Sequence, residues 1–98
     1  MVRHIILWKL KDGVTDAEKV KSEAKENLEA LVGKIEGLVS LKLHTSPLPS
    51  SNCDMMLESA FESADALAGY QIHPSHVAAA NAYVRPFTET RLCLDFEE

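Results

Sequence analysis

Residues 2–10, VRHIILWKL, carry apolar side chains at both odd and even positions, and this short stretch decides the fold. In an extended strand, successive side chains point to opposite faces of the sheet. One face would carry Val2, His4, Ile6, Trp8 and Leu10, and the other Arg3, Ile5, Leu7 and Lys9. Because the middle of each set is apolar, we expect a central strand with both of its faces covered.

A helix is predicted to follow this strand. Thr15 and Glu18 stand three positions apart, as in a capping box, with Thr15 as the N-cap. Apolar residues then recur at three- and four-residue steps over 17–35, with charged residues between them. Gly37 is placed to end this helix in the left-handed conformation.

A long hairpin is predicted next. Residues 38–44 alternate in polarity, which puts Val39, Leu41 and Leu43 on one face of a strand. Residues 45–52 contain two prolines and three serines, so we expect a surface loop there. Residues 53–61 then return as a strand that again has apolar side chains on both faces.

The second helical region is predicted to be split in two. Ser63 would cap a short helix that reaches about residue 70, and Pro74 suits the first turn of another that reaches about residue 84. Arg85 and Pro86 break that helix, because a proline disfavours helical geometry in the residue before it. Residues 87–96 form the last predicted strand.

The resulting order of elements is β-α-β-β-α-β. It predicts an α+β fold, a ferredoxin-like sandwich with a four-stranded antiparallel sheet, in a single domain over residues 1–98. Two helical segments cover only one face of such a sheet, yet the strands are apolar on both. We therefore expect a second copy of the chain to cover the other face, in a homodimer packed sheet to sheet.

The composition narrows the class of partner. The 98 residues include 15 acidic and 10 basic side chains, and the net charge of −5 argues against binding to nucleic acid. The apolar run at residues 5–8 is too short for a signal peptide or a membrane span, so we expect a cytoplasmic protein without membrane contact. Cys53 and Cys93 lack a metal-binding or redox spacing and are expected to be free thiols.

Residues 69–77, GYQIHPSHV, hold the main candidates for chemistry. If Pro74 begins a helix, His76 lies in its first turn, where the positive end of the dipole lowers the histidine pKa below its ordinary value of about 6.5. A neutral imidazole can accept a proton, and Tyr70 at the end of the preceding helix offers a phenol partner. His76 and Tyr70 are thus the predicted catalytic pair. The alternative is that this segment is only a junction between helices.

Other residues suggest a pocket but neither a metal nor a cofactor. His4 and Trp8 share one face of the first strand and are candidates to line a ligand site. His73 and His76 have the spacing of a helical metal pair, but no third ligand adjoins them in the sequence, so no functional metal is expected. The sequence has no P-loop, GxGxxG, GxSxG or CxxC motif, and we expect no cofactor.

Three segments of the sequence resemble the stress-responsive dimeric A/B barrel family, often called Dabb. They are VRHIILWKLKDGVT at 2–15, ESADALAGYQIHPSHV at 62–77 and VRPFTETRLCLDFE at 84–97. The resemblance spans nearly the whole chain. It implies a ferredoxin-like fold that dimerises through its sheets into an α/β barrel.

A plant polyketide cyclase is a characterised relative of that family, and the resemblance to it implies roles for individual residues. His76 would be the catalytic histidine, Tyr70 its paired tyrosine and His4 a pocket residue. Two other positions depart from the cyclase, with Met55 in place of a pocket histidine and Glu26 in place of a tyrosine. The pocket is therefore expected to differ from that of the cyclase. The expected ligand-binding residues are His4, Trp8, His73 and Met55.

The function expected from these observations is the binding of a small apolar or aromatic molecule by a homodimer, with His76 and Tyr70 as an acid-base pair. If the protein is an enzyme, it would be a cofactor-free lyase, cyclase or isomerase acting next to a carbonyl. Two alternatives stay open. One is a cofactor-independent oxygenase on the same scaffold, and the other is a non-catalytic stress-response protein.

Overall fold

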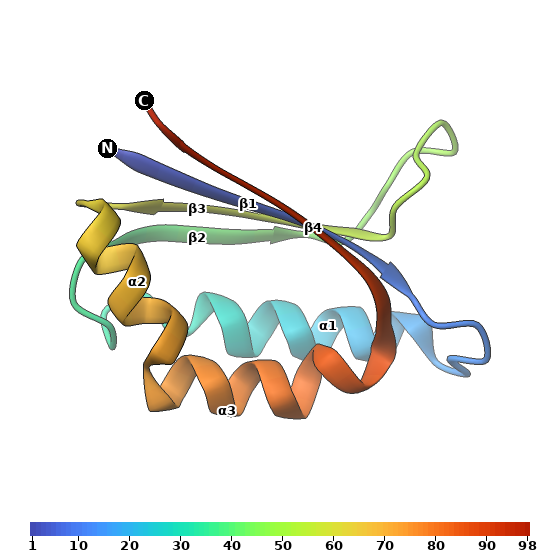
Figure 1. Ribbon diagram of the computed structural model, residues 1–98. Coiled ribbons are helices and arrows are strands. Elements are labelled where there is room, and N and C mark those ends of the chain that lie inside the picture. The colour runs from blue at the N-terminus through green and yellow to red at the C-terminus, as the bar shows by residue number, and fades with distance from the viewer.

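Helices cover one face of a four-stranded antiparallel sheet in the computed structural model, which describes residues 1–98 (Figure 1). The elements are β1 (Val2–Leu10), α1 (Ala17–Glu29), β2 (Leu38–His44), β3 (Met55–Phe61), α2 (Ala64–Ile72), α3 (Pro74–Tyr83), the 3₁₀ turn η1 (Arg85–Phe87) and β4 (Thr88–Glu97). The strand order is β2-β3-β1-β4, so β1 is internal, as predicted. This is the predicted ferredoxin-like α+β fold.

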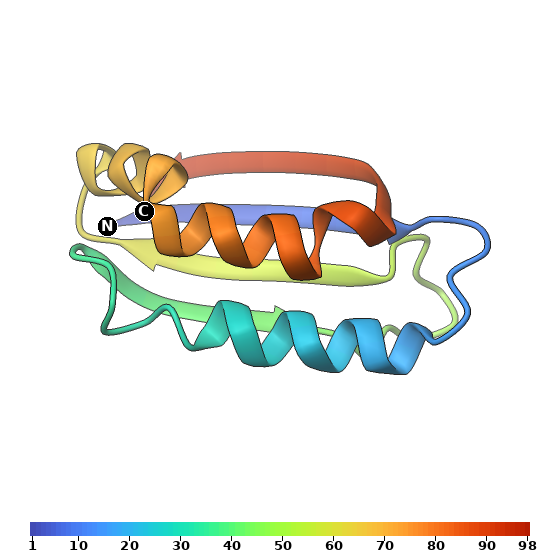
Figure 2. The ribbon, with the colours of Figure 1, turned by 90° about the horizontal axis from the view of Figure 1, so that it is seen from below.

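The core lies between the sheet and the helices. Ile6 on β1 pairs with Leu57 on β3, and both side chains are buried toward the helical layer. Seen from below, α1 lies under β2, α3 lies under the middle of the sheet, and β4 runs outside the helical layer (Figure 2). The edge strand β4 is therefore the strand that the helices cover least (Figure 2).

The first helix departs from the prediction at both ends. Its N-cap is Asp16, not Thr15, because the Asp16 carboxylate accepts the backbone N–H of Lys19 at 3.1 Å. It ends at Glu29 rather than continuing to residue 35, and the turns that follow include Gly33 at φ +90°. Leu31 and Ile35 are nevertheless buried in the core, which explains why their spacing resembled a longer helix.

A β-bulge changes the predicted face of β2. Leu38 pairs with Phe61 but Ser40 pairs with the preceding residue Ala60, so Val39 has no partner of its own. Leu38 is buried as a result, whereas Val39 is 43% exposed. The predicted placement of Val39 beside Leu41 was wrong because one extra residue reverses the alternation.

The predicted split of the second helical region is confirmed. The Ser63 hydroxyl accepts the backbone N–H of Ala66 at 3.1 Å and caps α2. His73 then caps α3, because its Nδ1 accepts the backbone N–H of Ser75 at 3.1 Å, and Pro74 is the first helical residue. The short η1 turn at Arg85–Phe87 delays β4 by one residue relative to the prediction.

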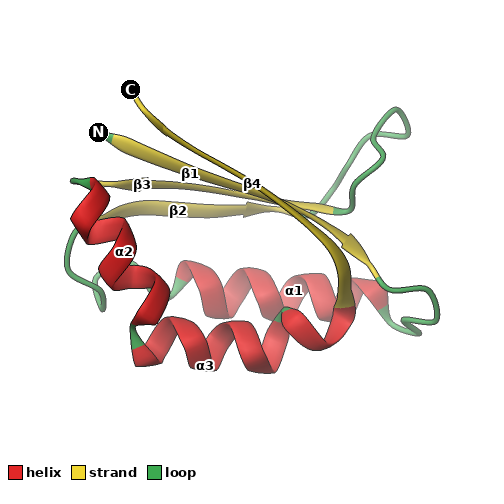
Figure 3. Cartoon of the chain, in the orientation of Figure 1, coloured by secondary structure: helices red, strands yellow, loops and turns green.

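The face of the sheet away from the helices is left uncovered (Figure 3), and it carries several exposed apolar side chains. Leu92, Leu94 and Phe96 on β4 are 58%, 65% and 43% exposed, and Ile5 and Leu7 on β1 lie beside them in register. The loop between β2 and β3 projects beyond the sheet on this same side (Figure 1). None of the helices combines the length and the hydrophobicity that a membrane crossing demands.

Candidate functional site

A cavity of about 330 Å³ lies between the sheet and α3. Four of the predicted site residues line it together, namely His4, Trp8, Tyr70 and His76. Two others lie elsewhere. The ring of His73 caps α3, and Met55 borders a separate cavity of about 390 Å³ under the loop between β2 and β3. The cavity of about 330 Å³ thus contains both members of the predicted catalytic pair.

Tyr70 projects from the last turns of α2 into the core beside the cavity. Its side chain is 1% exposed and packs edge-on against Phe61, with ring centroids 5.0 Å apart. Its hydroxyl is buried and has no hydrogen-bond partner. Burial raises the pKa of Tyr70 to about 12, although the positive charge of Arg91 acts in the opposite direction. Tyr70 is therefore a neutral phenol whose O–H is available to donate a hydrogen bond.

His76 lies directly against this phenol. The ring centroids of His76 and Tyr70 are 4.1 Å apart and the planes are inclined by 33°. Nδ1 of His76 donates to the carbonyl oxygen of Gln71 at 3.3 Å, because a carbonyl can only accept. In the neutral ring this leaves Nε2 as a proton acceptor. The hydrogen bond thereby selects the tautomer that a general base requires.

The environment keeps His76 uncharged. Burial is the main cause that lowers the pKa of His76, and the positive charges of Arg85 and Arg91 act in the same direction. The hydrogen bond to Gln71 opposes this shift but does not reverse it. The direction agrees with the shift predicted from the sequence, but the leading cause is burial, which the sequence argument did not consider.

The junction between α2 and α3 positions both rings. Because His73 caps α3 and Pro74 starts it, His76 falls in the first turn of this helix. The carbonyl of Gln71 lies in the last turn of α2, where carbonyl groups lack partners within their own helix. Each side chain is thus fixed by the way in which one helix ends and the next begins.

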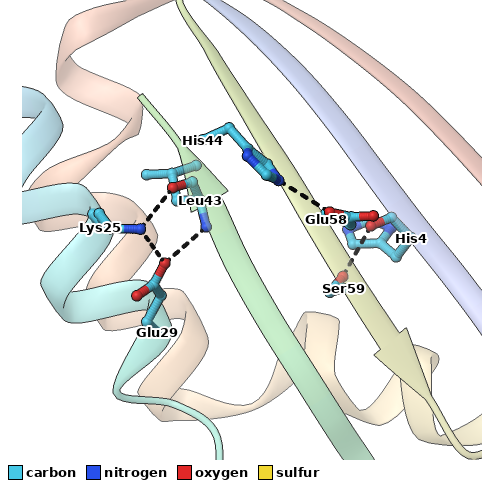
Figure 4. Close-up of polar contacts among 7 residues, drawn as sticks. All are labelled: His4, Lys25, Glu29, Leu43, His44, Glu58 and Ser59. Atoms are coloured by element: carbon cyan, nitrogen blue, oxygen red, sulfur yellow. Dashed lines mark hydrogen bonds and ion pairs between the residues drawn. The ribbon is translucent and has the colours of Figure 1, made fainter. Parts of the chain in front are cut away.

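His4 forms a second polar centre on the cavity wall. It lies opposite Asp95 in the register of β1 and β4, and its Nδ1 donates to the Asp95 carboxylate. Its backbone carbonyl accepts the Ser59 hydroxyl at 2.9 Å (Figure 4). The ring centroid of His4 is 6.2 Å from that of Tyr70. The imidazole is therefore held in a fixed orientation from the sheet side.

Cys93 joins His4 and Asp95 in a cluster of possible metal ligands. One donor atom from each residue lies within 4.8 Å of the others, and the Cys93 thiol donates to Asp95 at 3.4 Å. Burial and the adjacent Asp95 carboxylate raise the pKa of the Cys93 thiol, which disfavours the thiolate that a metal would need. Sequence reasoning missed this cluster because His4 is distant in sequence, and only the β1–β4 register brings it close.

A polar network away from the cavity ties α1 to the edge strand β2 (Figure 4). The Lys25 ammonium donates to Glu29 at 2.7 Å and to the carbonyl of Leu43 at 3.0 Å, and the backbone N–H of Leu43 donates to Glu29 at 3.0 Å. Burial alone would raise the pKa of Glu29, but the hydrogen bonds from Lys25 and Leu43 hold it below its ordinary value. The network is structural, since none of these residues lines the cavity beside Tyr70.

Arg85, Thr88 and Arg91 also line the cavity, and sequence reasoning did not single them out. Arg91 lies opposite Trp8 in the β1–β4 register, on the face that looks toward the helices. Arg85 lies in η1, just before β4. The alternation of side chains along β4 could have predicted that Arg91 faces the helices. It does not predict that Arg85, which lies outside the strand, lines the same cavity.

Comparison with known proteins places the chain among relatives of similar length. The sequence profile of the Stress responsive A/B Barrel Domain matches residues 2–98. An uncharacterized protein of Streptomyces coelicolor is 36% identical over 101 residues, covering 99% of each chain. Olivetolic acid cyclase of Cannabis sativa is 30% identical over 96 residues, covering 97% of this chain and 94% of the cyclase.

A solved structure from Bacteroides fragilis has the same fold. It is described as a dimeric protein of unknown function with a ferredoxin-like fold, and it superposes with a TM-score of 0.91 at 33% identity. The match covers 99% of this chain and 95% of that protein. The fold is therefore one that a similar protein uses in a dimer.

Proposed function

The chain belongs to the stress responsive A/B barrel domain family, and from this premise we propose that it is a homodimer that binds a small apolar or aromatic molecule beside Tyr70 and His76 and catalyses proton transfer on it. The observation that carries the proposal is the Tyr70 hydroxyl, which is buried, unpartnered and adjacent to the His76 ring. Burying a polar group without a partner costs about 1–3 kcal/mol, so such a group is typical of a binding site awaiting its ligand.

The two side chains suit opposite halves of an acid-base reaction. Nε2 of His76 would remove a proton from a carbon next to a substrate carbonyl. The Tyr70 hydroxyl, whose pKa is raised to about 12, would stay protonated and donate a hydrogen bond to the developing enolate oxygen. Return of the proton from His76 to another atom of the substrate completes an isomerisation, or an aldol closure if the enolate carbon first attacks a second carbonyl. No cofactor takes part in this scheme.

Similarity to olivetolic acid cyclase supports this class of reaction. Its name describes a cyclase, and ring closure of a polyketide requires carbanion chemistry next to carbonyl groups. Met55 and Glu26, the two positions that depart from the cyclase, do not line the cavity beside Tyr70. An identity of 30% does not by itself identify a substrate. We therefore propose the reaction class and not the substrate of that enzyme.

Homodimerisation would cover the open face of the sheet. Leu92, Leu94 and Phe96 form an exposed apolar patch with Ile5 and Leu7, and a patch of this kind on a soluble protein favours association. Dimeric relatives such as the Bacteroides fragilis protein support the same arrangement. The cavity lies on the opposite face, so the patch and the ligand site do not compete.

Exchange of an acidic C–H proton tests the proposed chemistry without knowledge of the substrate. 1-Phenyl-1,3-butanedione in D₂O is a suitable probe, with deuterium incorporation followed by NMR. We expect wild-type protein to accelerate exchange and both His76→Gln and Tyr70→Phe to lose about 10²-fold or more of that acceleration. Tyr83→Phe, which alters the other tyrosine of the chain, is the matched control and should retain full activity.

The same variants separate catalysis from a structural role. If His76→Gln and Tyr70→Phe change only the melting temperature, the protein is a non-catalytic member of its family and the acid-base proposal is wrong. Wild-type protein that neither binds aromatic probes nor accelerates exchange would contradict the binding role as well.

A further inference from the structure

The cavity beside Tyr70 and His76 is lined by positive charge, although the chain as a whole is negatively charged. The protein has 15 acidic and 10 basic residues, yet the residues that line this cavity include two arginines and no carboxylate. The arginines are Arg85, from the η1 turn, and Arg91, from β4. A positively charged site favours an anionic ligand, because the nearby arginines attract the anion even though the net charge of the protein is negative.

Neither arginine is neutralised by the protein. Arg85 donates to the amide oxygen of Asn81 at 2.6 Å, and neither guanidinium forms an ion pair with a carboxylate. Arg3 offers a contrast, because it lies on the open side of the sheet and is paired with Glu98. The guanidinium groups at the cavity thus keep their capacity to bind an anion.

Both arginines act on the proposed catalytic pair. Besides burial, the charges of Arg85 and Arg91 lower the pKa of His76. Arg91 also opposes the effect of burial on the pKa of Tyr70. All four groups line the same cavity, so an anion bound by the arginines would lie in the chamber that Tyr70 and His76 face.

Most of the remaining wall of the cavity is apolar, and its polar members are His4, Gln71 and Thr88. The apolar residues are Ile6, Trp8, Leu28, Leu57, Ala80 and Val84. The volume of about 330 Å³ is near the lower end of the range of roughly 300–1,000 Å³ for small-molecule sites. The site therefore combines a small, mostly apolar chamber, one unpartnered buried hydroxyl and two guanidinium groups that form no ion pair.

We propose that the ligand is a small organic acid, with an apolar or aromatic body held against Trp8 and a carboxylate held by Arg91 and Arg85. The proposal rests on the binding site of the proposed function and specifies the class of molecule that it takes. A planar guanidinium can form two parallel hydrogen bonds with a carboxylate, which fixes the orientation as well as the position of the ligand. The carboxylate would point the body of the molecule toward Tyr70 and His76.

Binding can be measured directly, because Trp8 is the single tryptophan of the chain and lines the cavity. The probes are 4-butylbenzoate and 4-butylbenzamide, which have nearly the same shape but differ in charge. Titration at pH 7.5 should quench or shift the Trp8 fluorescence. We expect the acid to bind at least roughly tenfold more tightly than the amide, since hydrogen bonds to charged groups are about twice as strong as neutral ones.

Two single variants, their double variant and one control identify the source of this preference. Arg91→Gln and Arg85→Gln should each reduce the preference for the acid over the amide, and the double variant should remove it. Arg3→Gln makes the same change in net charge on the other side of the sheet and should leave the preference unchanged. Circular dichroism of each variant confirms that it is folded before binding is compared.

The outcomes distinguish this inference from the proposed function. Equal affinity of the acid and the amide, with both binding in the cavity, would overturn the inference and leave the proposed binding function intact. A preference for the acid that survives in the double arginine variant, or that is lost in Arg3→Gln, would also overturn it. If neither probe changes the Trp8 signal, both the inference and the proposed binding function fail.

Discussion

The imidazole of His76 packs against the phenol of Tyr70 with ring centroids 4.1 Å apart, although the two residues belong to different helices. The junction that separates α2 from α3 brings them together. One ring is held as a proton acceptor by the Gln71 carbonyl, and the other keeps its proton because burial raises its pKa to about 12. The pair therefore combines a proton acceptor, His76, with a hydrogen-bond donor, Tyr70.

The pH dependence of stability should reflect His76. The pKa of His76 is lower in the folded protein than its ordinary value of about 6.5, so the unfolded chain binds the proton more readily. This group then contributes stability that is fully present above about pH 6.5 and is lost as the pH falls through the folded pKa. Denaturant unfolding from pH 5 to pH 8 should show less of this loss in His76→Gln. NMR titration that found His76 titrating well above pH 6.5 would contradict the lowered pKa and this prediction.

Tyr70→Phe should separate stability from activity. The substitution removes a buried hydroxyl that has no partner, so we expect the free energy of unfolding to stay the same or to rise by up to about 1 kcal/mol. Exchange activity should fall at the same time. Chemical denaturation of the variant, with Tyr83→Phe for comparison, measures the first effect. A clear loss of stability would indicate that the hydroxyl has a structural partner in solution.

Gly37→Ala should be more harmful than Gly33→Ala. Both glycines have positive φ angles, of 84° and 90°, which a residue with a Cβ atom rarely adopts. A Cβ atom on Gly37 would also come within 2.5 Å of the Ala66 side chain, whereas none of the neighbours of Gly33 lies within 4 Å of such an atom. We expect Gly33→Ala to cost about 1 kcal/mol and Gly37→Ala to cost more. Equal melting temperatures for the two variants would refute the close approach of α2.

A charge on the open face of the sheet should separate the proposed dimer. Leu94 is 65% exposed on β4, and Leu94→Glu would bury a carboxylate in the interface if two sheets pack there. Analytical ultracentrifugation should then show a monomer. Ile72→Glu, at a residue that is 79% exposed at the end of α2, is the matched control and should leave the dimer intact. A wild-type protein that is monomeric at all concentrations would rule out the dimer.

Removal of metal ions should have no effect on the protein. The ring of His4 and the thiol of Cys93 both donate to the Asp95 carboxylate, so the polar groups of this cluster have partners without an ion. We expect EDTA treatment to leave the melting temperature unchanged. Stoichiometric zinc in the purified protein, lost in Cys93→Ser, would show instead that the cluster is a metal site.

The sequence predicted the architecture because its strongest signals are local. Apolar side chains on both sides of residues 2–10 specify an internal strand, and the HP dipeptide at 73 and 74 specifies where α3 begins. These features depend on residues that are neighbours in the chain. The placement of Tyr70 and His76 on either side of that junction could be anticipated for the same reason.

The details that escaped prediction depend on contacts between distant segments. Thr15 and Asp16 are both good N-caps, and only the path of the chain selects Asp16. The bulge at Val39 depends on how β2 pairs with β3, which the alternation within β2 does not reveal. The meeting of Arg85 with Arg91 at one cavity likewise depends on the turn at η1.

The edge strand β4 presents two different surfaces from one short ribbon. Arg91 faces the ligand cavity, and its neighbour Leu92 faces the open side where a second copy is proposed to pack. Dimerisation would restrict the motion of β4, so the protein would lose less conformational entropy when a ligand binds. Ligand binding and dimerisation would then each increase the affinity of the other, because such coupling is reciprocal. Dilution of the protein into monomers would lower its affinity for the small molecule.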